Sequence, residues 1–443
     1  MTEWIIILQQ MKSLVIASLL SALSLAQTPA GCNGVLNTSP TLTLTPTPLK
    51  TVKNGQSWLM DDGAHNVLYI ARLSGTPYQM GHALGELYGE QIAKNIENLV
   101  DYGYQMLMDE TPIEDYIGIE WMRKALYYSV VPNLAALILD MNHIITAPYI
   151  PQSFYDEIQG IVDGSRGKVK YAHLRRINFV SEITRAHCTI LGAWGDATAD
   201  GKLYHLRTLD WNPTALVNEF PSLIIYEPST PGQQTYANVA WLGMVGTLTG
   251  MSKIGISIGE KVYYQKDGVQ YGKEPRWSYF GKPWQLVLKD VLLHAGDMHD
   301  VERLLTDTYR TAMIHLGVGS SVDNTFRGVD YSSNDLIFYD DTNYTHYSTD
   351  YHPQYDGIFY YDRHVQPSGS TCLKSIIDAN YGSITPEMLY KTVGGYHKTG
   401  DATIVVMDPA GQKMWIGFSQ YMTTVNAYTR SPLYVDLTQF WGA

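Results

Sequence analysis

One short stretch of the chain holds a cysteine, an arginine and an aspartate whose spacing favours nucleophilic chemistry. Cys188 opens an apolar, β-prone segment, and Arg207 and Asp210 end a second segment in which apolar and polar residues alternate. The Asp-Gly pair at 200–201 between them is a strong signal for a hairpin turn. The predicted hairpin places the thiol beside both charged groups. A nucleophilic thiol needs such charged neighbours, which help it to lose its proton and stabilise the charge that develops.

Strand geometry divides these side chains between two faces. In an unbroken strand, His205 and Arg207 share one face, while Thr208 and Asp210 share the other. A purely structural interpretation also exists, in which Cys188 is a small buried hydrophobe and the charged residues form an ion pair.

These motifs, in this order, resemble the N-terminal-nucleophile (Ntn) hydrolases, and among them the group of acid ceramidase, N-acylethanolamine amidase and penicillin acyltransferase-like proteins (peptidase C45). Residues 75–81 with 84–90, 246–252 and 397–401 are similar to the same group. Its members are made as inactive precursors that cut the peptide bond before the cysteine. The resemblance therefore implies a cut between His187 and Cys188.

The resemblance also implies the fold, an α+β four-layer αββα sandwich preceded by a mostly helical pro-segment. The pattern of helices before Cys188, and of strands interrupted by helices at 283–295 and 298–309 after it, supports a mixed α/β class by itself. The expected divisions are a signal peptide at 1–26, a flexible Thr/Pro-rich leader at 27–56, the N-terminal segment at 57–187 (the alpha subunit after cleavage) and the catalytic domain at 188–443 (the beta subunit).

In this group, the freed cysteine is the nucleophile and its new α-amino group is the base. The unperturbed pKa values of an α-amine and a thiol are about 8 and about 8.5, so proton transfer between them is nearly isoenergetic. The resemblance assigns Cys188 this role. It implies that Arg207 holds a substrate carbonyl or carboxylate and that Asp210 orients the α-ammonium.

An acyl-transfer enzyme also needs donors for the developing oxyanion. In the group an asparagine contributes, and Asn324 is the candidate here, with Gly319 and Ser320 as alternatives. Arg327 is a weaker candidate for a second arginine of the site.

The apolar segment 239–251 follows the hairpin and is expected to line the acyl side of the site. Trp241, Met244 and Met251 are the candidate substrate contacts, although plain core is an equal interpretation for each. The leading hypothesis is an exported, self-cleaving hydrolase of linear amides, with N-acyl amides and ceramide-like lipids as substrates. The alternatives are an acyltransferase, a phospholipase B-like esterase and a non-catalytic secreted binding protein.

Composition excludes some partners. The net charge is −12 and the chain has no long basic run, which argues against nucleic acid. There is no His-Glu-x-x-His motif, and the histidines at 346, 352 and 364 are irregularly spaced, so neither a metal nor another cofactor is expected. The expected partners are an amide substrate and the chain's own N-terminal fragment.

The N-terminus predicts export. Lys12 precedes an apolar run at 14–25, and 24–26 fits a signal-peptidase site, which indicates a secreted or lysosomal/endomembrane lumenal protein. The run is too short for a comfortable membrane span, and no other segment suits one. Sequons at Asn37 and Asn343 predict glycosylation in a eukaryotic secretory route.

The chain has only three cysteines, at positions 32, 188 and 372. A bridge between Cys32 and Cys372 is conceivable, and the sequence leaves it open. Residues 29–32 faintly resemble a lipidation box, which Pro29 fits badly.

Glycines recur every fourth residue in the helix expected after residue 76. Gly81, Gly85 and Gly89 leave one face of it almost without side chains. Because glycine weakens a helix interior, the repeat predicts that another backbone packs closely there.

Overall fold

The computed structural model describes residues 28–110, 131–182, 187–262, 276, 278–344 and 350–442. The predicted signal peptide at 1–26 and part of the predicted helical region at 119–147 lie outside these residues. Among the helices that are described, none combines the length and the apolar character that a membrane crossing requires.

Two β-sheets form the centre of the described structure. One sheet has the order β1-β2-β3-β6-β7-β8-β9-β10-β11-β12 and the other has the order β13-β4-β5-β14-β15-β16. Neighbouring strands are antiparallel except for β3 and β6, which run parallel. The first sheet consists of β1 (Thr47–Val52), β2 (Gly55–Asp61), β3 (Val67–Gly75), β6 (Pro221–Pro228), β7 (Tyr236–Trp241), β8 (Thr249–Ser252), β9 (Ile256–Val262), β10 (Met313–Ser320), β11 (Thr325–Ser332) and β12 (Leu336–Tyr339). The second consists of β4 (Ile190–Gly195), β5 (Gly201–Leu209), β13 (Ile358–Tyr361), β14 (Thr403–Asp408), β15 (Lys413–Phe418) and β16 (Leu433–Asp436).

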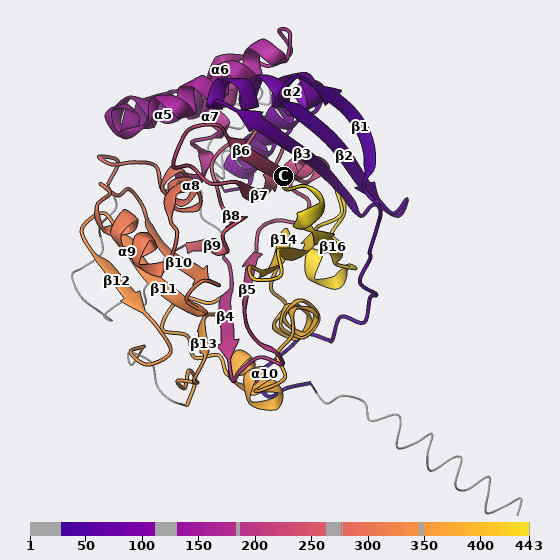
Figure 1. Ribbon diagram of the computed structural model, residues 1–443, viewed down its shortest axis with the longest axis vertical. Coiled ribbons are helices and arrows are strands. Elements are labelled where there is room, and N and C mark those ends of the chain that lie inside the picture. The colour runs from indigo at the N-terminus through magenta and orange to yellow at the C-terminus, as the bar shows by residue number, and fades with distance from the viewer. Residues whose placement is uncertain are drawn as a thin grey trace, which may run out of the picture.

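Helices cover the outer faces of both sheets. Helices α8 (Trp284–His294) and α9 (Met298–Thr306) pack on β8, β9 and β10 of the first sheet (Figure 1). The second sheet is covered by α10 (Cys372–Asn380), α11 (Pro386–Met388), the π-helical turn Leu389–Val393 and α12 (Gly394–His397). There Leu206 and Val406 of the sheet share a core with Leu373, Ile377 and Leu389 of the helices. The expected four-layer αββα sandwich is confirmed.

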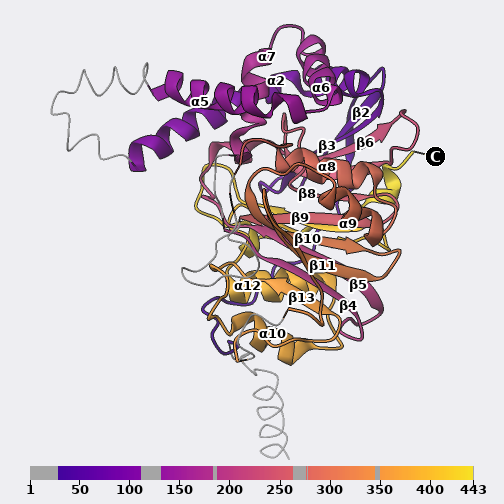
Figure 2. The same ribbon diagram turned by 90° about the vertical axis from the view of Figure 1, so that its left-hand side faces the viewer.

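Most of the segment before Cys188 lies at one end of the molecule, opposite the end that holds α10 (Figure 1). Its helices α2 (Pro77–Glu110), α5 (Val131–Thr146), α6 (Gln152–Gly164) and α7 (Tyr171–Ile177) gather there in both views (Figures 1 and 2). The segment is not only helical, because it also supplies β1, β2 and β3 to the first sheet. The sequence also predicts a strand at 65–73 from its apolar and β-prone residues, and this strand is confirmed as β3, whereas β1 and β2 were missed. Short 3-10 turns lie at Ala147–Tyr149, Val180–Glu182, Leu216–Glu219, Ala427–Thr429 and Leu437–Gln439.

The expectation of a flexible leader is wrong for the described residues 28–56. Cys32 forms a disulfide with Cys372, and the Asn37 amide donates to two backbone carbonyls near the C-terminus at 2.9 and 2.8 Å. Composition alone did not reveal these long-range partners. Because the Asn37 side chain is buried, its sequon is closed to glycosylation in the folded chain, whereas Asn343 is exposed.

The glycine repeat of α2 is the contact surface for α6, as predicted. A Cβ at Gly81 would lie 2.1 Å from the carbonyl oxygen of Glu157, and one at Gly85 would lie 2.3 Å from that of Ile161. These contacts are with backbone atoms, which cannot rotate away. The two helices therefore pack backbone against backbone.

Gly85→Ala should lower the free energy of unfolding by about 1–3 kcal/mol, because the new methyl group forces α2 and α6 apart. The sign of this change is informative, because helix propensity alone would make alanine more stable than glycine by about 1 kcal/mol. Denaturant unfolding measures the change. Gly369→Ala, whose added Cβ meets no atom within 4 Å, is the matched control and should be nearly neutral. A Gly85→Ala chain as stable as the parent would contradict the close packing.

Candidate active site

The β4–β5 hairpin positions the three residues that the sequence singled out. Ile190 pairs with Arg207, and just before β4, His187 forms a bridge with Asp210. Cys188 lies two residues before Ile190 and therefore faces the same side of the sheet as Arg207. The predicted hairpin and its two faces are confirmed.

Cys188 lies between the sheets and is completely buried. The Arg207 Nη2 atom is 3.9 Å from its Sγ atom. The same guanidinium forms a buried ion pair with the Glu260 carboxylate and donates from Nε to the Glu260 carbonyl at 3.2 Å. Gly259 makes room for the arginine, because a Cβ there would lie 2.6 Å from the Arg207 Cγ.

This environment keeps the thiol protonated in the intact chain. Burial, and after it the Glu260 carboxylate, raises the pKa of Cys188 to about 12, although Arg207 and Lys261 act to lower this pKa. A neutral buried thiol is a poor nucleophile. In the intact chain the Cys188 thiol therefore lies beside Arg207 in its neutral form.

Asp210 contributes through both its backbone and its side chain. Its N–H donates to the His187 carbonyl oxygen at 2.6 Å, and the His187 N–H donates to the Asp210 carbonyl at 3.2 Å. Its carboxylate accepts from the Gly400 N–H at 2.5 Å and from the Thr399 hydroxyl at 3.0 Å. The motif at 397–401 is therefore part of the site. The carbonyl that precedes Cys188 is polarised by a fixed donor.

Three charged residues of the site were missed. Arg363 places its Nε 3.4 Å from the Asp210 carboxylate, and Glu260 pairs with Arg207. Lys261 is wholly buried on β9, and among the described residues its Nζ has no hydrogen-bond partner. Burial lowers the pKa of Lys261, opposed chiefly by Cys188 and then by nearby carboxylates. Adjacent glutamate and lysine inside an apolar strand were the available signal, because such residues are rarely fully buried without a role.

The oxyanion assignment to Asn324 is wrong. Asn324 is exposed in the β10–β11 turn at φ 48°, a left-handed conformation that asparagine tolerates, and its amide donates to the Gly201 carbonyl at 2.9 Å. Gly201 lies six residues from Arg207 along β5, which is about 20 Å at 3.3 Å per residue. The alternatives Gly319 and Ser320 end β10 beside the same turn. All three are at the wrong end of the hairpin.

Arg327 is also outside the site. Its Nε is 3.2 Å from the Glu302 carboxylate on α9, on the outer face of the sheet. Arg363, which pairs with Asp210, is the second arginine at the site.

The three predicted substrate contacts do not line an open groove in the intact chain. Trp241 is 3% exposed, Met251 is completely buried, and only Met244 keeps partial exposure. Strand alternation directs Trp241 and Met251 into the core. Trp241 belongs instead to an aromatic cluster next to Asp210. In this cluster the ring-centroid distances are 5.2 Å for Tyr102–Trp211, 6.3 Å for Trp211–Trp241 and 5.9 Å for Trp241–Phe418.

A cavity of about 800 Å³ opens on the His187 side of the site. Arg363, His364, His397 and the Cys32–Cys372 disulfide are among the groups that line it. Its wall combines polar and apolar groups. The cavity reaches the residue on the far side of the expected cut rather than the buried thiol itself.

The thiol of the intact chain should resist modification. With Cys32 and Cys372 bridged, Cys188 is the only free thiol, and its raised pKa leaves very little thiolate at pH 8. Its reaction with a disulfide reagent such as DTNB should be at least about a hundredfold slower than in denaturant, where one equivalent reacts. Cys188→Ala should give no signal in either state. Fast reaction of the folded, uncut chain would show that the thiol is accessible and activated.

No family model matches the chain. It is 28% identical to protein dcd1A of Dictyostelium discoideum over 439 residues. This alignment covers 95% of this chain and 96% of that protein. It is 27% identical over 366 residues to protein dcd1B of the same organism, covering 81% of this chain and 70% of that protein.

Among solved structures, the chain is similar to an N-acylethanolamine-hydrolyzing acid amidase ortholog of Caenorhabditis elegans, with a TM-score of 0.30 and 13% identity over 56% of this chain and all of that one. It is also similar to penicillin V acylase of Agrobacterium tumefaciens, with a TM-score of 0.35 and 14% identity over 57% of this chain and 87% of that one. Likeness at this level leaves function to be argued from the site. The chain itself has the four-layer αββα sandwich, with a cysteine entering an inner strand, that its resemblance to the Ntn hydrolases implied.

Proposed function

We propose that the chain is the precursor of a cysteine Ntn hydrolase that cuts itself before Cys188 and then hydrolyses linear amides. One arrangement carries the proposal. The Cys188 thiol lies 3.9 Å from the Arg207 guanidinium and directly follows a carbonyl that the Asp210 N–H holds at 2.6 Å. Nucleophile, charge stabiliser and polarised carbonyl are thus neighbours in the uncut chain.

Maturation requires an attack within the chain. The Cys188 sulfur attacks the His187 carbonyl carbon, the bond from that carbon to the Cys188 nitrogen breaks, and a thioester and a free α-amine result. The Asp210 N–H stabilises the oxyanion of the tetrahedral intermediate. Water then opens the thioester and releases the His187 carboxylate.

The first step needs a base before any α-amine exists, and Lys261 suits this role. Burial lowers the pKa of its ammonium group and so favours the neutral amine. The neutral amine takes the thiol proton, and that proton then goes to the departing Cys188 nitrogen. Once the cut has been made, the α-amine replaces Lys261 as the base.

Turnover repeats the same chemistry on an external amide. The α-amine takes the thiol proton, the sulfur attacks the substrate carbonyl, and the leaving amine receives that proton. Water hydrolyses the acyl-thioester and restores the thiol. Arg207 stabilises negative charge at the sulfur, and Asp210, held by Thr399, Gly400 and Arg363, keeps the α-amine oriented.

The aromatic cluster beside Asp210 supports an apolar acyl group. Trp211 is half-buried and Trp241 lies behind it, while Tyr102 of α2 covers Trp211 from the N-terminal segment. The half-buried ring of Trp211 is the part of this surface that an acyl group can reach. N-acyl amides with extended or aromatic acyl groups match it in shape and polarity.

We also propose that the protein works outside the cell or in an endomembrane lumen. The Cys32–Cys372 disulfide supports this, because such bonds persist in oxidising compartments. The apolar run at 14–25 supplies the export signal.

The disulfide makes self-cleavage easy to recognise. It joins a cysteine before the cut to one after it, so the processed protein should run as one species without reductant and as two with it. The larger fragment should begin at Cys188 on N-terminal sequencing. Cys188→Ala should stay a single chain under both conditions, and Lys261→Met should slow the cut at least about tenfold if it supplies the base. A Cys188→Ala chain still cut at 187/188 would refute self-processing.

The acyl preference tests the apolar site. On the processed enzyme, kcat/KM for N-acyl amides should rise by up to about fourfold per added methylene, because burying a methylene contributes about 0.8 kcal/mol. Trp211→Ala should flatten this rise. Trp415→Ala, which removes an equally half-buried tryptophan that contacts Tyr434 on β16, should leave it unchanged. A preference for acetyl would favour a small polar substrate.

A further inference from the structure

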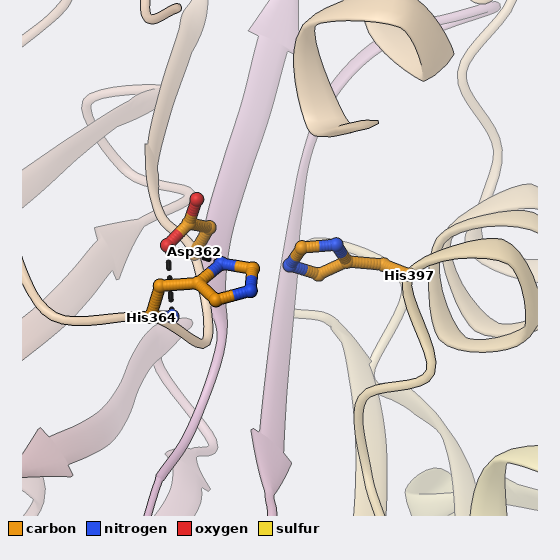
Figure 3. A group of neighbouring side chains, drawn as sticks. All are labelled: Asp362, His364 and His397. Atoms are coloured by element: carbon orange, nitrogen blue, oxygen red, sulfur yellow. Dashed lines mark hydrogen bonds and ion pairs between the residues drawn. The ribbon is translucent and has the colours of Figure 1, made fainter. Parts of the chain in front are cut away.

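A second cluster of reactive side chains lies beside the cavity and has no part in the proposed chemistry. It consists of Asp362, His364 and His397, whose ligand atoms all lie within 4.8 Å of one another. The two imidazole rings are 5.6 Å apart between centroids, at an interplanar angle of 70°. Figure 3 shows one ring nitrogen of each histidine directed at the other ring, with Asp362 behind His364.

His397 is the anomaly in this cluster. Its side chain is 4% exposed, yet among the described residues its Nε2 atom has no hydrogen-bond partner. Buried polar atoms are normally paired, because an unpaired one loses its water without compensation. The nitrogen points toward His364, which lines the same cavity.

Asp362 is held in place by other groups, as a metal-binding carboxylate usually is. Its Oδ1 atom accepts from the backbone N–H of His364 at 2.9 Å and from the side-chain amide of Gln366 at 3.0 Å. Such outer hydrogen bonds fix the orientation of a ligand before an ion arrives.

We propose that Asp362, His364 and His397 bind a divalent transition-metal ion, with Zn²⁺ as the best match. Two imidazoles and a carboxylate are a common donor set for zinc at a site with three protein ligands. Ligand atoms on a tetrahedral zinc with bonds of about 2.0–2.1 Å lie about 3.4 Å apart, so the cluster must contract. His364, with half of its side chain exposed, is free to rotate inward.

The fourth position of such an ion faces the cavity, because both histidines line it. Arg363 lies between two of the ligands in sequence and pairs with Asp210 at 3.4 Å and with Asp401 at 3.6 Å. A bound ion would therefore fix the loop that supports the Asp210 carboxylate. Arg363 also carries positive charge nearby, which limits the affinity of the site for a cation.

Zinc binding should be measured on tag-free protein that carries Cys188→Ala, so that no free thiol competes for the ion. Isothermal titration against a chelator of known affinity should give one equivalent of Zn²⁺, and excess Ca²⁺ should not displace it, because Ca²⁺ prefers oxygen ligands. Co²⁺ should show the visible absorption of a four-coordinate site and lose it when Zn²⁺ is added.

Variants of the cluster then locate the ion. His364→Ala, a change at an exposed side chain, should weaken Zn²⁺ binding at least about tenfold, whereas His299→Ala on the exposed side of α9 should not. His397→Gln provides a second test once circular dichroism has shown that it folds. Absence of stoichiometric binding, or equal affinity in His364→Ala and the parent, would overturn the proposal.

Discussion

The ion pair between Arg207 and Glu260, buried between the two sheets, is the constraint on which the site depends. Charges so far from water are costly, and removing one partner of such a pair typically costs about 3–5 kcal/mol. The pair exists only because Gly259 leaves space for the arginine and because β5 and β9 face each other. The same packing brings the guanidinium to the Cys188 sulfur, because the Nη2 atom that pairs with Glu260 also lies 3.9 Å from that sulfur. Sheet packing and nucleophile environment are therefore one arrangement.

Local signals explain how much of the fold was predictable. The Asp-Gly turn and the alternation around it located β4 and β5 within a few residues. Asp297 stands just before the helix expected at 298–309, which predicts an N-cap, and it does cap α9, accepting from the Asp300 N–H at 2.8 Å. The strands β1 and β2 lie in a segment whose composition resembles a linker, so their existence depends on pairing with β3 rather than on pattern. The strands β13 and β16 were also missed, because four residues are too few to show a clear alternation.

The residues of the candidate site likewise divide into those that a local pattern predicts and those that depend on the arrangement of distant segments. Cys188, Arg207 and Asp210 belong to one hairpin, so register alone brings them together. Residues from other strands could not be placed that way. Asn324 was assigned by analogy in sequence order, but its position follows from the β10–β11 turn at the far end of the sheet. Lys261 and Arg363 come into the site only through the order of strands and the loop before α10, which no local pattern encodes.

The segment before Cys188 is built into the fold, and this shapes what cleavage can do. It supplies β1 to β3, with β3 paired in parallel to β6 over residues 69–75 and 222–228, and the Cys32–Cys372 bridge ties its start to α10. A cut at 187/188 thus cannot release it as a separate body. The change that the cut makes is local. The peptide bond between His187 and Cys188 is lost beside the cavity, and Cys188 gains a free α-amine near the Asp210 carboxylate. In the mechanism that we propose, activation is a change of protonation chemistry at one buried position, with the surrounding sheets left as they are.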